Sequence, residues 1–527
     1  MVTFQLNLLI LAIASADTLE KVVLVGRHGV KNPVKPGMID QQLPYMEARH
    51  RAFNTTFGHL VPEGAKIMKC LGRELKFRYN DLMCTSYESC RREEPLVFTD
   101  PTSERDKTSA LAFMEGFYSI GNYSLYDSIT MPQGDLLNRM ENDDPMNVER
   151  ACGMPEYSDQ KTPKKSLEIM LKPTLQKLCR MLLGQTSSVS CPISSAAFDA
   201  RPAYRKSATP WRPFGGVLAE ASPYVEVLLM QYLSGHNSTQ GNLVTNANDV
   251  NDIIRIQQAL FNAIGYEIAQ NFGSELLVHI AASLLKNTNL PHSSYDIPLY
   301  DNSARVLIHF SHDSNLHFLR ELLRLKWTSE GWLSNFAAPG DMLAFELYKI
   351  KEEDEHNQKT HYYIKIAKLS MGPDTQRAIS KKKAAKKQNR MNKMDGRYPV
   401  SAEYLAIWGC DTQESGSGFE CPLEEFVELV LKAIKPKCVE NSDLKAILTH
   451  PSLFDIPKSI TTVLPSGVSG NVAGRVAMVI LAGLGSMCTL GLLYYMLFRK
   501  RSRSCLACVY GIAGRIKAVE IRGSKQP

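Results

Sequence analysis

Three short apolar segments of the chain are each followed at once by side chains that can do chemistry. The pairs are residues 22–25 followed by Arg27-His28, residues 96–98 followed by Arg105, and residues 306–310 followed by His312-Asp313. Each apolar segment has the length and composition of a buried strand. Parallel strands of an α/β sheet end at one edge, where ligands bind. We therefore expect these five side chains to converge on one crevice.

The chemistry that fits this group of side chains is transfer of a phosphoryl group to water. Arginine offers a planar fork of donors that matches a phosphate, and histidine can accept the phosphoryl group covalently. Nearby arginines disfavour the imidazolium form, which would keep His28 nucleophilic. A buried carboxyl group at Asp313 could protonate the leaving oxygen. The alternative is structural: His28 caps a helix and His312-Asp313 is a structural pair.

The segments around these motifs predict an α/β fold with a mostly parallel sheet and helices on both faces. Apolar residues at helical spacing follow each strand candidate, and strands alternating with helices are typical of such sheets. Residues of about 125–300 predict a helical insertion that caps the sheet edge, with helices at 167–183 and 250–285. Residues 343–347 and 362–366 predict a β-hairpin, with the charged stretch 349–359 as its long polar loop.

The two ends of the chain predict a type I membrane topology. Residues 1–16 contain an apolar run and end in Ala14-Ser15-Ala16, a small-x-small cleavage pattern typical of a signal peptide. Residues 476–498 carry no charged side chain and are long enough to span a bilayer. Residues 17–456 would then form a luminal or extracellular domain, and residues 457–475 a linker. The basic tail at 499–527 would lie in the cytosol.

The net charge of +7 comes from that tail. It holds 8 Lys+Arg and 1 Asp+Glu, which leaves 53 of each sign in the rest of the chain. This balance argues against a nucleic-acid partner, which would require a basic face on the folded domain. It agrees with a chain that crosses the membrane once and whose basic tail contacts anionic lipid. A second basic stretch at 377–397 carries nine Lys+Arg against one Asp and predicts a solvated, mobile surface insertion.

Nine of the 12 cysteines precede the predicted membrane segment, and an oxidising lumen would pair most of them. Their connectivity cannot be deduced from the sequence. No CxxC pair occurs in this part, which argues against a structural zinc site. Three acceptor sequons, at Asn54, Asn122 and Asn237, agree with a secretory route and predict glycosylation.

The order of these motifs resembles the histidine acid phosphatase family, the branch of the phosphoglycerate mutase-like superfamily that includes lysosomal and prostatic acid phosphatases and phytases. That family carries Arg-His-Gly-x-Arg-x-Pro after its first strand, then a Gly-containing helix, then Arg-Thr-x-x-Ser-Ala, and late in the fold a His-Asp pair. The matching positions here are Arg27-His28-Gly29-Val30-Lys31-Asn32-Pro33, Leu60, Gly64, Leu71 and Gly72, Arg105-Asp106-Lys107-Thr108-Ser109-Ala110, and Phe310-Ser311-His312-Asp313. The resemblance spans roughly residues 21–368.

The resemblance implies a phospho-His28 intermediate and Asp313 as the proton donor. It assigns phosphate binding to the cationic side chains of Arg27, Lys31, Arg105 and His312. It implies a phosphate monoester substrate and neither a cofactor nor a metal ion. The main departure is Lys31, which stands where the family has arginine and lacks the bidentate fork.

Two other functions stay open from the sequence. Lys31 favours a catalytically silent membrane receptor that binds phosphorylated ligands in the same pocket. The Lys-rich insertion favours an inositol polyphosphate phosphatase, in which it would hold additional phosphates. The final compartment is left open between the secretory and endolysosomal membranes and the cell surface, and a homodimer is one of the oligomeric states that the sequence allows.

Overall fold

The computed structural model describes residues 17–33, 53, 55–83, 95–100, 103–118, 164–183, 217–236, 244, 246–262, 265–286, 288, 304–354, 357–381, 398–410, 419–439 and 444. The chain divides into two units, residues 1–456 and 457–527, and every described residue belongs to the first. The predicted signal peptide, linker, membrane segment and tail therefore lie outside the described residues.

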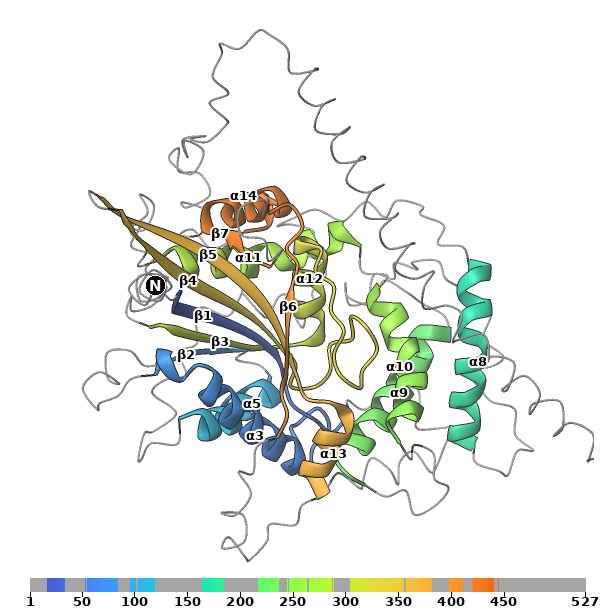
Figure 1. Ribbon diagram of the computed structural model, residues 1–527. Coiled ribbons are helices and arrows are strands. Elements are labelled where there is room, and N and C mark those ends of the chain that lie inside the picture. Colours follow the sequence, from blue (N-terminus) through green and yellow to red (C-terminus); the bar gives the residue numbers. More distant parts are fainter. Residues whose placement is uncertain are drawn as a thin grey trace, which may run out of the picture. The chain divides into compact units, whose positions relative to one another are not determined.

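One mixed sheet forms the centre of the described fold (Figure 1). Its strand order is β2-β3-β1-β4-β5-β6, and β7 pairs with β5. The strands are β1 (Thr18–Arg27), β2 (Leu96–Thr99), β3 (Val306–Ser311), β4 (Met342–Asp354), β5 (Asn357–Ser370), β6 (Ser401–Leu405) and β7 (Cys421–Pro422).

Strand β1 is central because its apolar run can be buried on both faces of the sheet. Successive side chains of a strand point to opposite faces. Val22 and Leu24 accordingly enter one hydrophobic core, whereas Val23 and Val25 enter the other. A strand covered on both sides reads as a continuous apolar run, which is the pattern that the sequence shows.

Helices cover both faces, as the sequence predicts. The core that contains Val22 is closed by α3 (Pro62–Arg78) and α5 (Glu104–Phe117), and the opposite core by α11 (Tyr266–Leu285), α12 (Asp313–Leu323) and α14 (Leu423–Ala433). Figure 1 shows these two groups on opposite sides of the sheet. Short 3₁₀ turns occupy Asn80–Leu82 and Pro436–Cys438.

The α/β class is confirmed, but the sheet is mixed where the sequence predicts a mostly parallel one. Strands β2, β3 and β1 pair in parallel, whereas β4, β5, β6 and β7 join through antiparallel pairs. The predicted hairpin is β4–β5, and its ladder continues to the pair Asp354↔Asn357. The predicted long polar loop at 349–359 is wrong, because most of this stretch belongs to the two paired strands.

The helical insertion contains α8 (Lys164–Leu183), α9 (Val217–Leu233) and α10 (Ala247–Asn262), of which α10 packs on both α8 and α9. The helix predicted at 250–285 is two helices, α10 and α11, and Gly265 lies at the N-terminus of the second. Helix α11 packs against α12 and α14 and so covers the sheet. The sequence places it in the insertion because its apolar pattern does not reveal which surface it covers.

Two further predictions, the Lys-rich surface insertion and the disulfides, fall only partly within the described residues. The Lys-rich segment begins inside a helix, α13 (Pro373–Lys381), where Arg377 donates a hydrogen bond to the Tyr232 carbonyl, so these first residues are not a loop. A disulfide joins Cys410 to Cys421, and Cys179 and Cys438 are also disulfide-bonded. No helix among the described residues is long and apolar enough to span a membrane.

Candidate functional site

The sheet register brings the predicted strand ends together. Strand β1 pairs in parallel with β3, and Arg27 lies opposite Ser311. On the other side of β3, Thr99 of β2 lies opposite Phe310. Arg27-His28, His312-Asp313 and the start of α5 therefore emerge at the same edge of the sheet, which confirms the convergence that the sequence predicts.

His28 is held in a defined tautomer. Its imidazole is almost fully buried, and Nδ1 lies 2.8 Å from the Gly29 carbonyl oxygen. A carbonyl oxygen can only accept, so Nδ1 carries the proton and the lone pair of the neutral ring is on Nε2. Burial, and next the charge of Arg105, hold the pKa of His28 well below its usual value. The ring is therefore neutral and can act as a nucleophile.

Helix α3 lies close against the segment that carries His28. Its Gly64 sits where a Cβ atom would overlap the Val30 carbonyl, so only glycine permits this approach. On the other side, the Gly29 amide donates a hydrogen bond of 2.9 Å to Ser109 Oγ of α5. The backbone after β1 is thus fixed by two helices that the sequence motifs contain.

Arg27 connects the strand end to Asp313. Its guanidinium is buried, donates through Nη1 to the Ala337 carbonyl at 2.7 Å, and places Nη2 3.0 Å from Asp313 Oδ2. Asp313 is the first residue of α12, and its Oδ1 accepts a hydrogen bond from the Ser314 amide. About a quarter of the Asp313 side chain is exposed, so a solvent-borne substrate can reach it.

His312 lies between the arginine of α5 and two buried carboxylates. Its Nδ1 is 3.3 Å from Arg105 Nη2, and its Nε2 is 3.4 Å from Asp106 Oδ2 and 3.8 Å from Asp100 Oδ2. The rings of His28 and His312 meet edge to face, with centroids 5.7 Å apart. Four of the predicted site residues, Arg27, His28, His312 and Asp313, therefore adjoin one another, and Arg105 joins them through His312.

Lys31 also lies at the site, but it is paired with a carboxylate from the helical insertion. Its side chain is almost fully buried, and Nζ is 3.0 Å from Glu226 Oε1 of α9. Burial is the largest influence on the pKa of Lys31 and lowers it, and Glu226 opposes this shift. A phosphate that binds to Lys31 must compete with that carboxylate.

Sequence reasoning predicted Asp313 but missed two other acidic residues of this site, Asp106 and Glu226. Asp106 is buried, and burial raises its pKa to about 6, against the opposing charges of His312 and Arg105. Asp106 stands where the resembling family has threonine, and this departure from the motif was the available signal. Glu226 gave no signal, because it lies within an apolar helical pattern in the middle of the chain.

Cation binding can be assessed among the described residues. His28, Asp106 and His312 each offer a ligand atom, all within 4.8 Å of one another, so their donor set is compatible with one transition-metal ion. These are the same side chains that would handle a phosphate, and a metal-free site stays a prediction. The sequons at Asn54, Asn122 and Asn237 lie outside the described residues, so glycosylation also stays a prediction.

Comparisons with known proteins show the family to which the chain belongs. The family description "Histidine phosphatase superfamily (branch 2)" matches residues 18–367. Phytase AppA of Escherichia coli (strain K12) is 24% identical over 349 residues, which cover 63% of this chain and 77% of that protein.

Two solved structures of phytases share the fold. The phytase of Klebsiella sp. ASR1 has a TM-score of 0.57 at 18% identity, and the match covers 81% of this chain and 99% of that one. The Hafnia alvei phytase in complex with myo-inositol hexakis sulphate has a TM-score of 0.56 at 19% identity, covering 81% and 100%. At these identities the structures establish the common fold.

Proposed function

The chain belongs to branch 2 of the histidine phosphatase superfamily, and from this premise we propose that it hydrolyses phosphate monoesters through a phosphohistidine at His28. The observation that carries the proposal is the state of His28. Its Nδ1 proton is engaged by a carbonyl, and its Nε2 carries the lone pair amid cationic side chains. This arrangement suits a nucleophile that attacks a phosphate dianion.

In the proposed first step, Nε2 of His28 attacks phosphorus, and a P–N bond forms as the P–O bond to the leaving group breaks. The carboxyl group of Asp313 donates its proton to the leaving oxygen. In the second step, a water molecule attacks phosphorus while Asp313 takes one of its protons, and the P–N bond breaks. Inorganic phosphate leaves, and both side chains return to their starting states.

The cationic side chains stabilise the charge that develops on the phosphoryl oxygens. Arg27, Arg105 and His312 lie around His28. Lys31 lies at the same site, where it is paired with Glu226. Donors fixed before the reaction act without reorganisation, which is the most effective form of electrostatic stabilisation. The raised pKa of Asp106 supports an acidic working range, because a neutral Asp106 leaves more net positive charge for the substrate.

The test is an aryl phosphate assay across acidic pH with the native chain, His28→Ala and His59→Ala. His59 is exposed and its side chain is outside the group described above, so it is a matched control for loss of a histidine. We expect His28→Ala to abolish turnover and the acid-labile phosphoenzyme trapped by rapid quench, and His59→Ala to retain both. A His28 variant that still turns over would refute the mechanism.

A role for Asp313 is tested by the leaving group. Asp313→Asn should slow esters of poor leaving groups far more than esters of good ones, because only the former need a proton in the transition state. Equal slowing of both would argue against proton donation by Asp313.

A second candidate function is hydrolysis of inositol polyphosphates. The proteins compared above are named phytases, and the structure of one is a complex with myo-inositol hexakis sulphate. A panel that compares simple monoesters with inositol hexakisphosphate separates the two substrate classes. Phosphate binding with no turnover of any ester would instead favour the silent receptor.

The cellular placement is also a proposal. We propose a single-pass type I protein of the secretory pathway, on the strength of the apolar segments at 1–16 and 476–498. Two measurements would test it. The domain should be protected from protease in intact vesicles, and its electrophoretic mobility should increase after enzymatic deglycosylation. Accessibility of the domain in the cytosol would refute it.

A further inference from the structure

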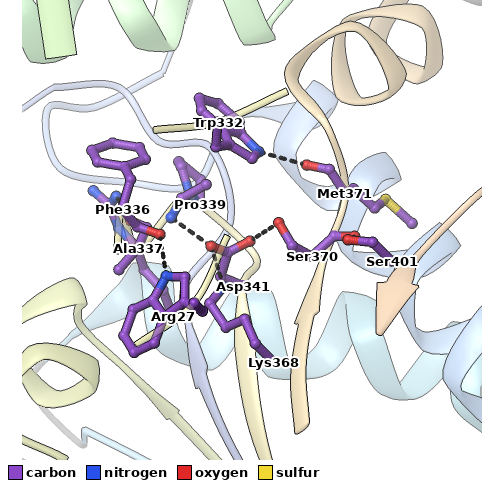
Figure 2. A network of polar contacts seen from close by, with 12 residues as sticks. Arg27, Trp332, Phe336, Ala337, Pro339, Asp341, Lys368, Ser370, Met371 and Ser401 are labelled. Carbon is purple, nitrogen blue, oxygen red and sulfur yellow. Dashed lines mark hydrogen bonds and ion pairs between the residues drawn. The ribbon is translucent and has the colours of Figure 1, made fainter. Parts of the chain in front are cut away.

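A buried polar network lies next to Arg27 (Figure 2). Its centre is Asp341, directly before β4. Asp341 Oδ1 accepts a hydrogen bond of 2.5 Å from Ser370 Oγ, and Oδ2 accepts one of 2.8 Å from the Ala338 amide. Lys368 of β5 forms an ion pair with the same Oδ2.

The turn that this network fixes, residues 337–341, holds the segment that carries the nucleophile at three points. The Ala337 carbonyl accepts the hydrogen bond from Arg27 Nη1. The Arg27 amide donates to the Asp341 carbonyl at 2.9 Å, and the Gly340 amide donates to the His28 carbonyl at 3.1 Å. The backbone and the guanidinium of Arg27 are therefore both held in place by the turn that Asp341 anchors.

Further contacts brace the same turn from outside. Gln376 Nε2 donates to the Pro339 carbonyl at 3.0 Å and also lies 3.2 Å from the Met371 carbonyl. Trp332 Nε1 donates to that Met371 carbonyl at 2.9 Å, and Figure 2 shows this contact beside the Asp341 group. These hydrogen bonds hold the turn in a defined position, which is what a positioning element needs.

The ion pair is poorly explained by stability alone. Asp341 and Lys368 are both almost completely removed from water. Taking two charges out of water costs more free energy than many such pairs return, and apolar replacements are often as stable or more so. A role in geometry accounts for the pair better, because the Arg27 guanidinium must present Nη2 toward Asp313 with Nη1 fixed behind it.

We propose that Asp341 and Lys368 are positioning residues for phosphate binding, acting through the 337–341 turn on the guanidinium of Arg27. This inference rests on the phosphate-binding role proposed above for Arg27. When the pair is broken, the turn loses its anchor and the Arg27 fork moves away from the position at which it meets the phosphate.

The experiment measures the competitive inhibition constant of inorganic phosphate and its direct binding by calorimetry. Asp341→Asn removes the charge with little change in volume, and we expect phosphate affinity to fall about tenfold, since a weakened hydrogen bond from a charged donor changes affinity by about this factor. Glu346→Gln is the matched control. Glu346 lies on β4, the strand that Asp341 directly precedes, is similarly buried and pairs with Arg78 at 2.9 Å. We expect it to lower the melting temperature but to leave phosphate affinity unchanged.

Coupling to Arg27 separates positioning from general loss of structure. In an Arg27→Ala background, Asp341→Asn should have no further effect on phosphate affinity, because its effect passes through the missing guanidinium. Additive effects of the two substitutions, or an equal loss of affinity in Glu346→Gln, would overturn the inference. Ser370→Ala is a milder variant that removes one hydrogen bond to Asp341 without stranding a charge, and it should weaken phosphate binding a few-fold.

The outcomes also distinguish this inference from the proposed function. If Arg27→Ala itself leaves phosphate affinity unchanged, the proposed role of Arg27 fails and the positioning inference fails with it. If Arg27→Ala weakens binding but both Asp341→Asn and Ser370→Ala bind as the native chain does, only the positioning inference is wrong.

Discussion

Replacement of Glu226 by glutamine tests whether the insertion competes with phosphate for Lys31. In the structure, Glu226 Oε1 lies 3.0 Å from Lys31 Nζ, and the Glu226 side chain is 21% exposed. Phosphate must displace this carboxylate or bind beside it. The Glu226→Gln variant keeps the size of the side chain and removes its charge, so Lys31 becomes available to the phosphate.

The size of the gain follows from the strength of that contact. A hydrogen bond to a charged group contributes about 1.5–3 kcal/mol. The partial exposure of Glu226 argues for the lower end, because solvent screens the pair. A gain of about 1.5 kcal/mol corresponds to roughly tenfold tighter phosphate binding. The same change leaves a buried lysine without its anion, so we expect the variant without phosphate to be less stable.

Thermal denaturation with a phosphate titration measures both effects without reference to turnover. The variant should melt below the native chain in the absence of phosphate and recover more strongly as phosphate is added, since a ligand stabilises the state that it binds. In a Lys31→Met background the substitution should change phosphate affinity little. Weaker phosphate binding in Glu226→Gln would refute competition and would show that the carboxylate positions Lys31 for the ligand.

Two predictions concern the α3–α5 side of the pocket. Burial raises the pKa of Asp106 from 3.8 to about 6, so its ionisation costs about 3 kcal/mol above pH 6, a cost that fades as pH falls toward 4. We therefore expect the free energy of unfolding of Asp106→Asn, relative to that of the native chain, to rise by about 3 kcal/mol between pH 4 and pH 7, as measured by urea denaturation. A difference that does not change with pH would contradict this prediction. In Gly72→Ala, the new methyl group would overlap the Phe113 carbonyl of α5, which should cost about 1–3 kcal/mol by the same assay. Gly265→Ala, with open space around it, should cost less than about 1 kcal/mol; equal losses would refute the packing argument.

The chain itself specifies the half of the site that depends on parallel strands. Residues 22–25 and 306–310 are apolar throughout because both of their faces are covered. The carboxyl ends of neighbouring parallel strands must share an edge, and local pattern alone therefore placed His28 beside His312. The motif spacing added the role of each side chain through resemblance to a family.

Only the tertiary structure decided which acidic side chains face those cations. Glu226 reaches Lys31 from α9, Asp106 reaches His312 from α5, and Lys368 reaches Asp341 from a neighbouring strand. The β4–β5 hairpin was predicted, but its antiparallel pairing with β1 was not, because strand direction depends on how the chain returns and leaves no mark on a short apolar run. The periodicity of apolar residues indicates that one face of a helix or strand is buried, but it does not indicate which element packs against that face. Pairing between charges distant in sequence depends on the packing of whole elements, and that packing sets the electrostatics of this site.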